Sequence, residues 1–135
     1  IWVSPSKKKR NIHGWNDSWK KYLFYLPESS SGYGYTSKAF IFSIRNIRGL
    51  KPFKIMVKQP QYAIYKQSNY GPTFGYNHQL YIADNANVGT PSHTKFDRYS
   101  SRYYSSIPGS GWNPSFVLAG SQNFQIADWE VFYVV

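Results

Sequence analysis

The side chains that most often perform catalysis or bind metals are few in this chain and lie far apart. There are three histidines, six acidic residues and no cysteine among 135 residues. The lack of cysteine excludes disulfides, thiolate nucleophiles and cysteine-based zinc or iron sites. The histidines, His13, His78 and His93, have no HExxH or comparable metal-binding spacing. We expect no bound metal, and His78 and Asp84 are the first ligands to test.

The polar run at residues 84–87 offers a second kind of site. Asp84, Asn85 and Asn87 carry the oxygen ligands that calcium prefers, but an Asp-Asn turn more commonly caps its own backbone. The preceding segment 71–75 has two glycines and a proline, yet neither the dinucleotide-binding GxGxxG pattern nor the P-loop pattern is present. We interpret this segment as a turn before a strand.

No group of residues predicts a nucleophile with its base. The serines at 100, 101, 105 and 106 lack the Gly-x-Ser-x-Gly elbow of serine hydrolases. Glu130, between Trp129 and Val131, is more typical of a structural ion-pair partner than of an acid catalyst. We therefore expect a protein that binds without catalysing a reaction.

Aromatic side chains are the most prominent feature of the composition. The chain has 13 Tyr, 9 Phe and 5 Trp, which together make up 20% of the residues. A core of this size does not need so many large rings, and Tyr keeps a polar end for water or a partner. Flat rings stack on apolar or conjugated molecules, such as carotenoid-type polyene pigments, and on sugar faces. The candidate ligand-binding rings are Tyr22, Phe24, Tyr25, Tyr33, Tyr35, Tyr99, Tyr103, Tyr104 and Trp112.

The elements that must position these rings are mostly strands. Hydrophobic alternation predicts strands over residues 38–45 and 53–57, each with one buried face, and further strands at 61–66, 79–83, 116–119 and 128–135. We expect residues 92–111 to form a short helix or a long functional loop, and residues 1–14 to form a basic N-terminal arm or an edge strand. The length fits one domain over residues 1–135. The fold expected is mainly β: an antiparallel β-sandwich with one or two short helices.

Four blocks, with their order and spacing, resemble the TLDc domain, in particular the versions found in invertebrate proteins. The resemblance covers residues 36–135 and rests on Lys38–Ile44, Ala63–Tyr65 with Tyr70–Gly75, Leu80–Ala86, and Leu118–Ser121 leading to Glu130–Phe132. It implies a TLDc-type β-sandwich. It also implies the family's intracellular role, which is associated with protection against oxidative stress and with binding the vacuolar proton pump.

The resemblance implies a further block of strand and helix before the point that corresponds to Ile1–Trp19, and this block has no counterpart in the sequence. An incomplete sandwich would leave strand edges and apolar surface uncovered. We therefore expect a second polypeptide chain to complete or cover the sandwich, which makes the protein one chain of a hetero-oligomer, unless the block has been lost and replaced.

Three functions from different classes follow from these observations. The favoured one is a secreted binding protein that holds an apolar or conjugated ligand and its partner chain; the Asn16-Asp17-Ser18 sequon makes Asn16 a candidate glycosylation site in that setting. The alternative is the cytoplasmic TLDc interaction module. The third is nucleic-acid or polyanion binding through the net charge of +10, although the cations are spread over the chain without an RNP signature. Apolar runs are too short for a membrane span.

Overall fold

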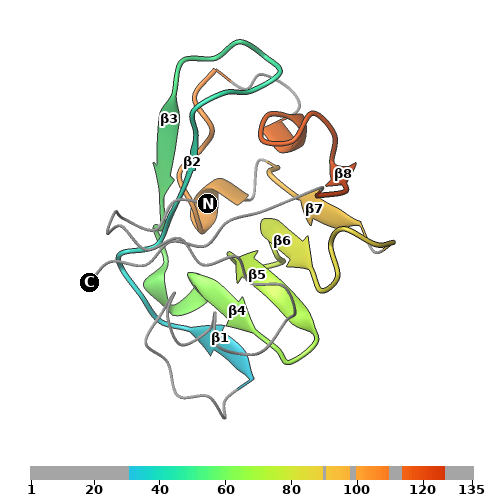
Figure 1. Ribbon diagram of the computed structural model, residues 1–135. Helices are drawn as coiled ribbons and strands as arrows, with labels where there is room; N and C mark the ends of the chain where they lie inside the picture. Colours follow the sequence, from blue (N-terminus) through green and yellow to red (C-terminus); the bar gives the residue numbers. More distant parts are fainter. Residues whose placement is uncertain (1–30, 90, 98–99, 110–113, 127–135) are drawn as a thin grey trace, which may run out of the picture.

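Two antiparallel sheets make up the part of the chain that the computed structural model describes, which is residues 31–89, 91–97, 100–109 and 114–126 (Figure 1). The larger sheet has the order β1-β4-β5-β6-β7-β8, and β2 pairs with β3 in a separate hairpin. The larger sheet contains β1 (Gly32–Gly34), β4 (Ile64–Lys66), β5 (Tyr70–Phe74), β6 (Leu80–Ala83), β7 (Ser92–Thr94) and β8 (Asn123–Phe124). The hairpin consists of β2 (Phe40–Ser43) and β3 (Phe53–Met56), and the short 3-10 turns are η1 (Pro60–Tyr62), η2 (Ser100–Arg102) and η3 (Pro114–Phe116).

The mainly β, antiparallel fold is thus confirmed, and strands lie within the predicted ranges 38–45, 53–57, 61–66 and 79–83. Among the described residues the helical segments are short 3-10 turns, and no helix there is long and apolar enough to cross a membrane. The predicted strand 128–135 and N-terminal segment 1–14 lie outside the described residues.

The predicted strand at 116–119 is wrong, because this apolar run belongs to the helical turn η3 and its continuation. Pro114 begins the turn, where its missing N–H costs nothing. The N–H of Val117 donates to the carbonyl of Pro114 at 3.2 Å, and Gly120, with φ +82°, ends the turn by donating to Phe116 at 2.8 Å. Val117 is fully buried, so it contributes to the core without forming a strand, whereas Phe116 and Ala119 are exposed.

The segment 71–75 was predicted as a turn and is instead the greater part of strand β5. The pairing of β5 with β6 shifts register between Tyr70 and Thr73. Such an irregularity is where a sheet tolerates Pro72, which has no N–H to donate to the ladder. Residues 92–111 likewise differ from the prediction, because they begin with strand β7 and reach the short turn η2.

One hydrophobic core joins the two sheets. Ile41 and Ile55 from the hairpin pack in the same cluster as Ile64, Phe74 and Leu80 from the larger sheet. Each such side chain contributes about 1.5–3 kcal/mol when fully buried. The segment around Tyr104 closes the assembly beside β3: Ser105 N–H donates to the Met56 carbonyl at 2.9 Å, and Lys58 N–H donates to that of Tyr103 at 2.7 Å.

The register of the larger sheet separates a core face from a tyrosine face. Ile64, Phe74, Leu80 and Thr94 are successive partners across four strands, and all four are buried. Because neighbours along a strand point to opposite sides, the next row lies on the other face. That row consists of Tyr33, Tyr65, Thr73, Tyr81 and His93. We call it the tyrosine row.

Candidate ligand-binding site

Four tyrosine rings gather at the β1 end of the tyrosine row, to which one of them, Tyr33, belongs. We call them the tyrosine cluster: Tyr33, Tyr62, Tyr76 and Tyr103. Tyr76 stacks between Tyr33 and Tyr103, with ring centroids 5.5 Å and 4.9 Å apart and interplanar angles of 19° and 25°. Tyr62 meets the other three edge-on, at 5.2, 5.1 and 5.7 Å. Each such pair contributes about 0.5–1.5 kcal/mol beyond its buried area, so the rings hold one another in place.

Ring contacts continue from the cluster across the sheet. Tyr33 meets Tyr65 at 5.1 Å, and Tyr65 meets His78 at 4.9 Å. Farther along, Tyr81 lies 4.9 Å from His93. The result is an unbroken aromatic surface from strand β1 to strand β7.

The turn between β5 and β6 fixes two members of this surface. Gly75, Asn77 and His78 have φ values of +78°, +59° and +56°, a left-handed conformation that residues other than glycine rarely adopt. A side chain at Gly75 would meet Gln79 Oε1 at 2.2 Å, so glycine is required there. The Gly75 N–H also donates to the Ala63 carbonyl at 3.1 Å, which ties the turn to the start of β4. Tyr76 and His78 are therefore presented by a fixed backbone.

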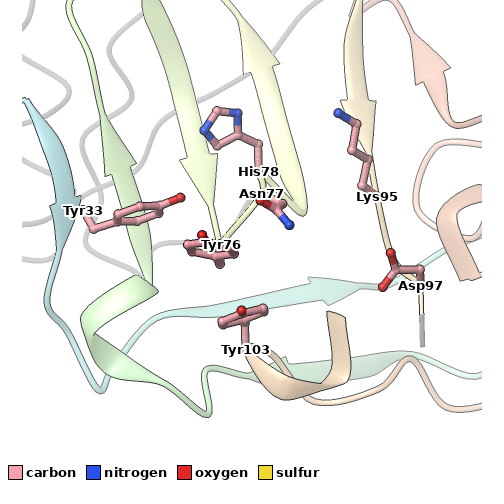
Figure 2. Close-up of a pocket in the computed structure, with 7 residues that line it drawn as sticks. All are labelled: Tyr33, Tyr76, Asn77, His78, Lys95, Asp97 and Tyr103. Carbon is pink, nitrogen blue, oxygen red and sulfur yellow. The ribbon is translucent and has the colours of Figure 1, made fainter. Parts of the chain in front are cut away.

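A pocket of about 450 Å³ opens between these elements, within the usual size range of small-molecule sites. Figure 2 shows Tyr33, Tyr76 and Tyr103 along one side and Lys95 and Asp97 on the other. Asn77 and His78 lie between them, at the end of the β5–β6 turn. The pocket therefore joins an aromatic wall to a polar one.

Burial favours the neutral forms of His78 and His93 and of the Tyr33 phenol. Desolvation, with Lys95 nearby, lowers the pKa of His78, and the same causes together with His78 lower the pKa of His93 to about 4. Desolvation raises the pKa of Tyr33, against a smaller opposing effect from a backbone hydrogen bond with Asn77. The neutral His78 imidazole and the Tyr33 phenol thus line the pocket, and the acidic and basic side chains of the lining are Asp97 and Lys95.

The proposed metal ligands do not form a site in the described part of the chain. No group of three or more His, Cys, Asp or Glu side chains that could hold a metal ion occurs among those residues. His78 lines the pocket and contacts Tyr65 and Tyr70. Asp84 follows the end of β6 and is half-buried. His78 thus has an aromatic environment.

The predicted ligand-binding rings lie in different places in the structure. Tyr33 and Tyr103 line the pocket, whereas Tyr35 is 69% exposed and is not among the lining residues. The prediction of Tyr104 as a ligand-binding ring is wrong. Its side chain is fully buried and its hydroxyl donates to the Ala63 carbonyl at 2.8 Å, so Tyr104 belongs to the core. The remaining predicted positions, Tyr22, Phe24, Tyr25, Tyr99 and Trp112 with the sequon at Asn16, lie outside the described residues.

Sequence reasoning missed Tyr62 and Tyr76, which complete the cluster. Tyr62 lies in the predicted strand 61–66, but its part of that segment forms the 3-10 turn η1, so strand alternation did not give its direction. Tyr76 sits in the β5–β6 turn, outside every predicted strand. A signal did exist for Tyr65, because it stands between the apolar Ile64 and the buried stem of Lys66 and must point to the opposite face.

Comparison with known proteins supports the resemblance seen in the sequence. The sequence model of the TLDc domain matches residues 9–135, which includes the whole range 36–135 on which the resemblance rests. No match was found among curated proteins or among solved structures.

Proposed function

Because the chain belongs to the TLDc domain family, whose domains are generally interaction or protection modules, we propose that it is a non-catalytic binding module that holds a flat, conjugated ligand. The binding site is the pocket beside the tyrosine cluster. The observation that carries the proposal is the stack of Tyr33, Tyr76 and Tyr103 along one wall of a cavity of about 450 Å³.

The chemistry of the two walls supports a conjugated ligand with a polar end. Tyr33 and Tyr103 cover both faces of the Tyr76 ring, so the aromatic wall meets a ligand through ring edges and through those faces of the two end rings that are turned away from Tyr76. A conjugated molecule makes such apolar contacts at little entropic cost. The opposite wall, with Asn77, Lys95 and Asp97, supplies hydrogen-bonding and charged groups. A polyene or pigment with one polar end group fits both walls: the conjugated body lies on the tyrosines and the end group faces Lys95.

Two further parts of the proposal concern the setting. We predict that the protein is secreted with a glycan at Asn16, and that a second polypeptide chain lies beside the sandwich. A native mass spectrum of the protein from its source would test both the glycan and the second chain. The runner-up is an intracellular interaction module, in which a protein partner would contact the tyrosine face in place of a small molecule.

The test compares two ligands that share a carboxylate but differ in conjugation: all-trans-retinoic acid, a polyene, and palmitic acid, a saturated chain. Calorimetric titration measures both affinities, and induced circular dichroism reports whether the polyene is held rigidly. We expect one retinoic acid per chain, bound at least about tenfold more tightly than palmitic acid, because about two ring contacts contribute roughly 1.4 kcal/mol.

Tyr33→Leu and Tyr35→Leu form a matched pair, since both residues lie at the β1 edge but only Tyr33 lines the pocket. Tyr33→Leu should weaken retinoic acid about fivefold or more, and Tyr35→Leu should leave it unchanged. Equal affinities for the two acids would show that the site selects apolar chains without regard to conjugation. Failure of the protein to bind either acid would refute the pocket as a polyene site.

A further inference from the structure

The β2–β3 hairpin has a second surface that the pocket does not use. Its outer face carries Phe40, Phe42 and Met56, and the connecting loop carries Ile44 and Ile47, which are 65% and 73% exposed. In Figure 1 the hairpin loop and strand β1 of the pocket lie at opposite ends of the molecule. We call the segment 44–51 the hairpin tip.

Cations alternate with these apolar side chains. Arg45, Arg48 and Lys51 are exposed in the tip, and the Lys54 ammonium lies 3.9 Å from the centre of the Phe40 ring. Residues 31–83 contain no Asp or Glu to neutralise them. The lysines and arginines of that stretch are Lys38, Arg45, Arg48, Lys51, Lys54, Lys58 and Lys66. The tip therefore combines aliphatic surface with positive charge that no acidic residue within 31–83 offsets.

Internal contacts hold the tip in one shape. The Asn46 side chain accepts from the Leu50 N–H at 2.9 Å and donates to the Leu50 carbonyl at 3.0 Å. Leu50 lies against Gly109, and Ile47 lies close to Gly120. Because these contacts brace the loop at its base, its backbone is ordered before a partner binds, and the two isoleucines are exposed on it.

We propose that the hairpin tip docks on an anionic phospholipid surface, with Ile44 and Ile47 entering the interfacial region and Arg45, Arg48 and Lys51 contacting phosphate groups. A bilayer interface accepts aliphatic side chains and attracts cations at the same depth. Each cation near an anionic surface changes the affinity about fivefold, so three cations and two small apolar anchors produce reversible binding.

The composition of the tip favours lipid over nucleic acid. Proteins that bind single strands place aromatic rings for base stacking among their cations, and residues 44–51 contain no aromatic residue. The phosphate backbone of a nucleic acid also offers no apolar surface to exposed isoleucines, whereas a membrane interface stabilises them.

The test is flotation of the full chain with phosphatidylcholine vesicles and with vesicles containing about 30% phosphatidylserine, at low and high salt. We expect binding to the anionic vesicles alone, weakened by salt. Arg48→Gln should weaken it about fivefold and Ile47→Ser roughly tenfold. Arg102→Gln and Val88→Ser are matched controls, because they make comparable changes at exposed sites outside the tip and should leave binding within about twofold of wild type.

Four results would overturn the proposal. One is no binding to anionic vesicles. Another is equal loss from Arg48→Gln and Arg102→Gln, which would indicate attraction by net charge alone. The third is wild-type binding by Ile47→Ser, which would show that the apolar side chain does not enter the interface. The fourth is tighter binding to an oligonucleotide than to the vesicles, which would assign the tip to nucleic acid. Retention of the far-UV circular dichroism spectrum confirms that each variant is folded.

Discussion

The buried phenol of Tyr104 makes the stability of this protein sensitive to alkaline pH. Its side chain is 0% exposed, and burial raises its pKa well above the ordinary value of 10.0. Since the folded state keeps the proton that the unfolded state loses, stability falls as pH rises above 10.0. At about pH 11, one unit above the unfolded pKa, this single group lowers the free energy of unfolding by about 1.4 kcal/mol.

Tyr104→Phe removes both the titration and a hydrogen bond. The hydroxyl donates to the Ala63 carbonyl, which also accepts from the Gly75 N–H, so the carbonyl keeps one partner in the variant. We therefore expect the variant to lose only about 1 kcal/mol at about pH 8. At about pH 11 the wild type has lost a further 1.4 kcal/mol or so of its stability, and the variant is then at least as stable as the wild type.

Urea unfolding of both proteins at the two pH values measures this double difference. Other groups that titrate in this range, including Tyr33 and Tyr81 with their raised pKa values, are present in both proteins and cancel. An equal loss of stability between the two pH values in wild type and variant would refute the burial of this phenol.

Two further changes probe the turn and the tyrosine row. Gly49 and Gly75 both have positive φ, but a side chain has open space at Gly49 and collides with Gln79 at Gly75. We expect urea unfolding to show a stability loss of about 1 kcal/mol for Gly49→Ala and at least twice that for Gly75→Ala. Equal losses for the two variants would contradict the collision. Because the folded pKa of His93 is about 4, stability should decline as pH falls below the ordinary value of 6.5. His93→Gln should flatten this decline between about pH 7 and pH 5 in thermal unfolding, and an unchanged decline would assign it to other groups.

Sequence alone predicted those elements in which a period-two pattern coincides with a buried face. Ile55 between Lys54 and Met56 is such a case, and strand β3 forms there. The pattern failed where proline and glycine set the backbone. Pro72 suggested a turn, yet a register shift lets it remain inside β5. Pro114 and Gly120 enclose an apolar run in a helical turn, although composition favoured a strand.

The binding site was only partly predictable, because it is assembled by register and turns. The wealth of tyrosine indicated that rings would be in use for binding, but not which ones. Tyr104 and Tyr103 are adjacent in sequence, and one lies in the core while the other lines the pocket. Tyr76 stacks on Tyr103 from the β5–β6 turn, whose backbone has positive φ at Gly75, Asn77 and His78.

The strand order of the larger sheet has a consequence for folding. Strands β4 to β7 follow one another as a meander of neighbours, whereas β1 pairs with β4, and β8 with β7, across about 30 residues each. Pairing between distant residues carries a larger loop-closure cost and slows folding. We therefore expect the two edge strands, β1 and β8, to join the sheet after the β4–β7 meander. Tyr33 belongs to β1, so the aromatic wall would be completed only when this edge strand pairs, and hydrogen exchange would show the β1 edge opening while the meander stays intact.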